Sequence, residues 1–197
     1  MKEKKHLNNN GFSLMELIVC LAISGFVVVA AYSLVMVGTK SYDTNSKNTN
    51  LQQEVSFTNN LLRETILAGN QSRAYIWTSN DGKLIELHTD TSGGKIICYD
   101  KDTHAVYIYN ESASWTCGDF NSDTNKREHL VTEYATDFKA DFVATAAGVS
   151  IPDWTSGSSG KIKNGIDCTN LIKIVITFEY KSKKDESNVV YQIRNKS

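Results

Sequence analysis

Residues 11–38 read GFSLMELIVCLAISGFVVVAAYSLVMVG, and this stretch decides how the chain is organised. From Leu17 to Gly38 there are 22 residues without a charged side chain. As an α-helix they would rise about 33 Å. Because the hydrocarbon core of a bilayer is about 30 Å thick, one such helix can cross it. The stretch therefore predicts a transmembrane helix near the N-terminus.

The residues before this stretch indicate its orientation. Residues 1–11 carry Lys2, Lys4 and Lys5 against Glu3. Positive charges favour the cytoplasmic side, so the bulk of the chain is expected outside the cytoplasm. A cleaved secretory signal has an apolar region of only about 7 to 15 residues, which is shorter than the region seen here.

Glu16 separates a plain membrane anchor from a more specific interpretation. An ionised carboxylate inside an apolar helix costs roughly 2.5 to 3.5 kcal/mol on insertion scales, and an anchor has no need of it. The string from Gly11 to Glu16 is GFSLME, after a short basic leader. It resembles type IV prepilins, in which a leader ending in Gly precedes Phe, a few small or apolar residues, and Glu as the fifth mature residue.

The resemblance implies a processing step and an assembly step. A prepilin peptidase would cut after Gly11, release residues 1–11 and methylate the new amine of Phe12. Glu16 would then pair with the N-terminal amine of a neighbouring subunit, since two opposite charges buried together cost less than either alone. The implied partners are the peptidase, other pilins or pseudopilins, and an assembly platform with its ATPase in the membrane. No cofactor is implied.

The residues after the span continue the helix. Residues 12–38 are assigned to the transmembrane or filament-core part, and residues 39–69 to an amphipathic part. Apolar and small residues recur there at steps of three and four, as in a helix packed on one side: Leu51, Val55, Thr58, Leu62 and Ile66, with Leu61 adjoining. Thr39 to Asn50 is rich in Thr, Asn and Ser, so both an ordinary exposed helix and a bent or melted segment stay open.

Residues 70–197 are expected to form a β-rich head, which makes the fold class α+β with an antiparallel sheet. Short apolar runs separated by Gly, Asn and Asp predict strands. Their ranges are 74–78, 83–89, 95–100, 105–110, 137–145, 171–180 and 188–194. Residues 128–136 are expected to be a short helix or a turn, and residues 155–165 an exposed loop. This layout resembles minor, PilW-like or J-type pseudopilin-like subunits. Ser33 stands where many major pilins have Pro, which also favours a minor subunit.

Four cysteines occur at positions 20, 98, 117 and 168. Cys20 lies in the span and Cys98 in an apolar strand, and both are expected to act as small apolar residues. Cys117 and Cys168 lie in polar loops, so we favour a disulfide between them if the compartment is oxidising. Three reduced cysteines in the head stay an alternative.

No metal site or catalytic site is predicted. His88, His104 and His129 have no partner at the spacing of metal ligands. Residues 119–125 begin like a calcium loop, but Thr124 stands where Gly is required and Leu130 where Glu is required. The sequence thus gives no sign of an enzyme.

The predicted function is a structural subunit, a minor pilin or pseudopilin of a type IV pilus, a type II secretion system or a competence pseudopilus. It would sit in the cytoplasmic membrane with one span and then move into a filament at the cell surface. A pilin-anchored binding module, either a tip adhesin or a DNA-uptake receptor, is the alternative. With 21 basic and 22 acidic residues the chain has a net charge of −1. DNA is a partner only in this alternative, and the net charge gives no support for it.

Overall fold

The computed structural model describes residues 13–90, 93–111, 116–143, 155–156, 160–164 and 170–193. The chain divides into two units, one ending at Ser46 and one beginning at Lys47. The predicted Gly11 and Phe12 lie outside the described residues, as does Cys168.

Helix α1 runs from Leu14 to Leu67 and includes Thr39 to Asn50, so that polar segment is helical rather than melted. In the first unit its apolar side chains are exposed in every direction; Leu14, Phe26 and Leu34 are 74–79% exposed. By length and composition this helix could cross a membrane. A surface that is apolar all round requires lipid or other apolar helices around it.

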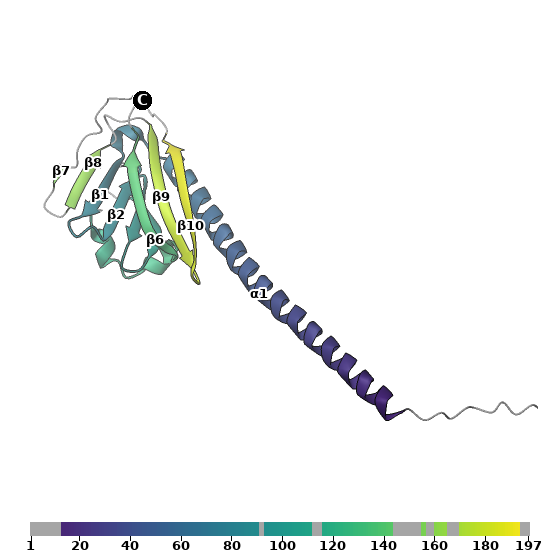
Figure 1. The fold of residues 1–197 in the computed structure, drawn as a ribbon. Helices are drawn as coiled ribbons and strands as arrows, with labels where there is room; N and C mark the ends of the chain where they lie inside the picture. Colours follow the sequence, from purple (N-terminus) through teal and green to yellow (C-terminus); the bar gives the residue numbers. More distant parts are fainter. Residues whose placement is uncertain are drawn as a thin grey trace, which may run out of the picture. The chain divides into compact units, whose positions relative to one another are not determined.

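The second unit combines the end of α1 with two antiparallel sheets (Figure 1). The first sheet has seven strands in the order β5-β4-β3-β2-β1-β8-β7, and the second has three in the order β10-β9-β6. The strands are β1 (Tyr75–Ser79), β2 (Leu84–His88), β3 (Lys95–Asp100), β4 (Ala105–Asn110), β5 (Leu130–Thr132), β6 (Ala135–Phe142), β7 (Thr155–Ser156), β8 (Gly160–Asn164), β9 (Leu171–Tyr180) and β10 (Lys183–Gln192). Short 3₁₀ helices are η1 (Gln71–Arg73), η2 (Asp119–Ser122) and η3 (Lys126–His129).

The main core lies where α1 and the two sheets meet. Strand residues alternate between faces, so every second side chain of β9 points inward, from Ile172 to Phe178. The helix contributes Leu51, Leu62 and Ile66. The amphipathic stripe predicted from the sequence is therefore confirmed as the buried face of α1.

A second core covers the other face of the seven-stranded sheet. In β3, Ile97 and Tyr99 point into the main core, whereas Ile96 and Cys98 point into the second core. The segment from Thr116 to His129 supplies Phe120, which is completely buried there. Cys98 is a buried core residue, as expected.

Some predicted boundaries were wrong. Residues 130–132 form β5, which pairs with β4, where a short helix or turn was expected. The stretch expected as an exposed loop contains β7 and β8, and β8 pairs with β1 along Gly160–Asn164. Its small and polar residues hid this strand, because backbone pairing with the edge of β1 orders it rather than a run of apolar side chains. Strand β10 begins at Lys183 rather than at residue 188, directly after a tight turn in which Lys181 and Ser182 have positive φ.

Candidate functional site

The start of α1 holds the described part of the predicted processing and assembly site. The backbone N–H of Glu16 donates to the Ser13 hydroxyl at 3.3 Å and to the Ser13 carbonyl at 3.1 Å. Ser13 thus caps the helix, and Glu16 lies in its first turn. A carboxylate in this position is stabilised by the unpaired N–H groups and by the positive end of the helix dipole. A favourable interaction with the helix N-terminus is therefore a local role open to Glu16, alongside the predicted pairing role.

The head contains a buried polar cluster that the sequence did not reveal. Strand alternation places Glu86 and His88 on the same face of β2, towards the second core. Both side chains are completely buried. His88 Nε2 lies 3.2 Å from Glu86 Oε2, and His88 Nδ1 lies 3.1 Å from Glu111 Oε1. Cys117 completes the group, since one ligand atom each of Glu86, His88 and Cys117 lie within 4.8 Å of one another.

Neighbouring residues fix the orientation of this cluster. Tyr75 is the partner of His88 across β1 and β2, and its ring stacks on the imidazole with centroids 4.1 Å apart and planes inclined by 10°. The Tyr75 hydroxyl lies 3.6 Å from Cys117 Sγ. The backbone N–H of Gly118 donates to Glu86 Oε1 at 3.0 Å. Tyr75 therefore fixes the imidazole of His88, and the Gly118 N–H fixes the carboxylate of Glu86.

The neighbours of His88 favour its protonated form. Burial by itself lowers the pKa of His88, but interactions with Cys117, Glu111 and Glu86 outweigh it and raise the pKa to about 10. Both ring nitrogens then donate, one to each carboxylate. Burial also raises the pKa of the Tyr75 hydroxyl, which is neutral beside them.

Of the other residues that the sequence singled out, Cys98 lies opposite Glu86 in the pairing of β2 with β3, whereas His104, His129 and Asp119 are not members of the cluster. His104 is an exposed turn residue with φ of 55°. His129 packs against Tyr109 with ring centroids 4.2 Å apart and planes inclined by 33°. Asp119 accepts hydrogen bonds from the backbone and the hydroxyl of Thr116 at 2.6 and 2.7 Å, and so serves its own turn.

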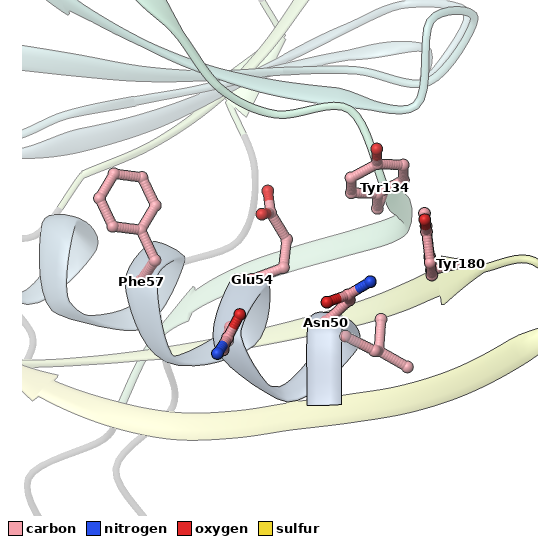
Figure 2. A pocket seen from close by; sticks show the side chains of 7 residues that line it. Asn50, Glu54, Phe57, Tyr134 and Tyr180 are labelled. Carbon is pink, nitrogen blue, oxygen red and sulfur yellow. The ribbon is translucent and has the colours of Figure 1, made fainter. Parts of the chain in front are cut away.

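One surface groove lies between α1 and the ends of β6 and β9. It has a volume of about 390 Å³ and is lined by Asn50, Leu51, Gln53, Glu54, Phe57, Tyr134 and Tyr180. Figure 2 shows Phe57, Glu54 and Asn50 rising from the helix, with the two tyrosines across from them. Tyr134 and Tyr180 pack edge to face with centroids 5.1 Å apart. The groove has no convergent charges or nucleophile that would indicate catalysis.

A comparison with family models finds one match in the chain. Residues 6–32 match the prokaryotic N-terminal methylation motif. No curated protein and no solved structure matches the chain. The motif supports a pilin or pseudopilin subunit that is anchored in a membrane, processed by a prepilin peptidase and assembled with other pilins. It points to a structural subunit rather than an enzyme.

Proposed function

We propose that this protein is a minor pilin or pseudopilin that enters a filament through the first part of α1. The observation that carries the proposal is an apolar helix, exposed on all sides, that begins with an acidic residue inside a prepilin motif. Lipid would shield this surface from water before assembly, and similar helices of other subunits would shield it afterwards. Since one apolar environment replaces another, transfer needs outside work, which an assembly ATPase would supply.

Processing is proposed to occur between Gly11 and Phe12, with methylation of the Phe12 amine. Cleavage places a cationic amine four residues before Glu16, at the start of the helix. In a bundle of such helices the amine of one subunit can neutralise Glu16 of the next, and this pairing would set their register. With the N-terminus on the cytoplasmic side, residues 12–38 would lie in the membrane or filament core. Residues 39–69 would form the second part of the helix, and residues 70–197 would form the head outside the cytoplasm.

The disulfide between Cys117 and Cys168 stays a prediction, as do the choice among pilus, secretion and competence systems and the minor subtype. The alternative of a tip adhesin or DNA receptor stays a prediction without an observation in its favour.

Glu16→Gln tests the pairing role apart from the capping role. Glutamine at this helix position can still serve in a capping box, whereas its charge is gone. We expect the variant to insert in the membrane and to be cleaved after Gly11, and its incorporation into sheared filaments to fall at least about tenfold, which corresponds to about 1.4 kcal/mol of lost pairing. Glu64→Gln is the matched control, because Glu64 is an exposed acid on the same helix.

Mass spectrometry of the mature N-terminus measures processing, and immunoblotting of the filament fraction measures incorporation. An intact Met1, or cleavage within the apolar run, contradicts the prepilin assignment itself. Normal incorporation of correctly processed Glu16→Gln contradicts only the pairing role.

A further inference from the structure

The buried cluster in the head has the composition of a transition-metal site. Carboxylate oxygen, imidazole nitrogen and cysteine sulfur converge from Glu86, His88 and Cys117. Zinc binds these three donor types, with bonds of about 2.0–2.2 Å to oxygen and nitrogen and about 2.3 Å to sulfur. Magnesium and calcium prefer oxygen donors only, so the sulfur and nitrogen exclude them.

The spacing of the oxygen and nitrogen donors fits a tetrahedral ion. Two bonds of about 2.0–2.1 Å at a tetrahedral angle place an oxygen and a nitrogen about 3.3 Å apart. Glu86 Oε2 and His88 Nε2 are 3.2 Å apart. Little movement of either side chain is therefore needed to admit an ion between them on the side of Cys117.

The groups behind the donors are arranged as in metal sites. A histidine that binds a metal usually donates its other N–H to a carboxylate, and His88 Nδ1 already contacts Glu111 at 3.1 Å. The N–H of Gly118 holds Glu86 Oε1, which leaves Oε2 to face the ring. The stacked ring of Tyr75 fixes the imidazole plane.

Glu111 is the buried partner of His88. Its side chain is only 6% exposed, and its Oε1 atom lies 3.1 Å from His88 Nδ1. A carboxylate held in this way can orient the histidine towards a ligand on the other ring nitrogen.

We propose that the head binds one Zn²⁺ through Glu86 Oε2, His88 Nε2 and Cys117 Sγ, with Glu111 orienting the histidine and with water as the fourth ligand beside the half-buried cysteine. Zinc binds cysteine as the thiolate and histidine through an unprotonated ring nitrogen.

The ion would stabilise the second core by linking β2 to the segment that packs over it. Glu86 and His88 belong to β2, whereas Cys117 belongs to the segment that covers this face of the sheet and carries Phe120. Zinc would join these two parts as a disulfide would. It also competes with a disulfide, since a Cys117–Cys168 bond would consume the thiolate that zinc requires.

Metal titration of the full chain in detergent tests the site. The protein is reduced, stripped with a chelator and titrated with Zn²⁺, and separately with Co²⁺ as a coloured probe. We expect one ion per chain, tetrahedral Co²⁺ bands and a thiolate-to-cobalt charge-transfer band. Zn²⁺ should also displace the cobalt.

Variants distinguish a ligand from a neighbour. Cys117→Ser should abolish the charge-transfer band and weaken Zn²⁺ binding by more than 100-fold. Glu111→Gln should retain the band and weaken binding by about 10- to 100-fold, as expected of a group that only positions a ligand. Cys20→Ser and His104→Asn are the matched controls, because both residues are exposed and neither belongs to the cluster. Both variants should bind Zn²⁺ as the unmodified chain does.

Three results would overturn the proposal. They are failure of the reduced, folded chain to bind Zn²⁺, binding that Cys117→Ser leaves unchanged, and a Cys117–Cys168 peptide recovered quantitatively from protein isolated without reductant. Circular dichroism of each variant verifies folding, and the charge-transfer band of the unmodified chain decides the question even where a variant does not fold. None of these outcomes depends on filament incorporation.

Discussion

Truncation of Leu62 to alanine should destabilise the head strongly, because this side chain is 0% exposed in the main core. Replacing a buried leucine by alanine costs about 2–5 kcal/mol, from lost transfer energy and from the cavity that is left. Thr58 and Ile66, one turn away on either side, are also 0% exposed, so the site has little room to collapse. We therefore expect the upper part of this range, about 3–5 kcal/mol. Leucine and alanine are both good helix formers, so propensity changes this by only a few tenths of a kcal/mol.

Phe57→Ala is the control on the exposed side of the same helix. Phe57 is 54% exposed, so we expect it to cost less than about 1 kcal/mol. Urea unfolding of the full chain in detergent micelles, followed by near-ultraviolet circular dichroism, measures both variants. A thermal scan gives a second measurement. In a unit of this size each kcal/mol lowers Tm by about 2–4 °C, so Leu62→Ala should lower the Tm of the head by at least about 6 °C. Equal free energies of unfolding for the two variants would refute the assignment of this stripe to the core.

Two further substitutions test how the head is held together. Asn59→Ala should cost about 1–2 kcal/mol in the same unfolding assay, because Asn59 Oδ1 accepts hydrogen bonds from two hydroxyl groups of β10 at 2.8 and 3.1 Å; a value below about 0.5 kcal/mol would contradict this link. Gly160→Ala should cost about 1–3 kcal/mol, because an added Cβ would collide with the Thr78 carbonyl and the Trp77 ring. Retained stability together with unchanged near-ultraviolet dichroism would show that β8 does not lie against β1 in this way.

The helix and most of its buried face could be predicted from the sequence, because both depend on local pattern. An uncharged run long enough to cross a bilayer is rare in a chain that stays in water, and residues at steps of three and four fall on one face. Leu51, Leu62 and Ile66 are buried as that spacing predicted. The strand Leu171–Tyr180 was found for a similar reason, since its apolar residues alternate with more exposed ones along ten positions.

Strand β8 could not be found in this way, because its order depends on a partner far away in the sequence. Gly160–Asn164 pairs with β1, about 85 residues earlier. Such a strand is stabilised by backbone hydrogen bonds and by close approach, and a glycine facing Trp77 serves that approach. Composition alone made the same residues resemble a loop.

The polar cluster was only half visible in the sequence. Glu86 and His88 stand two residues apart in a predicted strand, so their shared face could have been inferred. Two ionisable side chains on the buried face of a strand indicate a buried polar cluster. The spacing between histidines alone does not reveal such a cluster. Cys117 could not be added, because the loop that carries it follows two more strands and returns across the sheet.

The burial pattern of α1 separates assembly from folding. From Leu51 to Ile66 the helix contributes to the main core, so this part is a component of the head rather than a linker to it. The apolar residues of the first unit, by contrast, have no core of their own and are exposed. Glu16 and Leu62 therefore lie in different units. Variants at the two positions should therefore act independently. Glu16→Gln should reduce incorporation without changing the unfolding of the head, and Leu62→Ala should lower the unfolding free energy without changing cleavage. The double variant should show both effects unaltered.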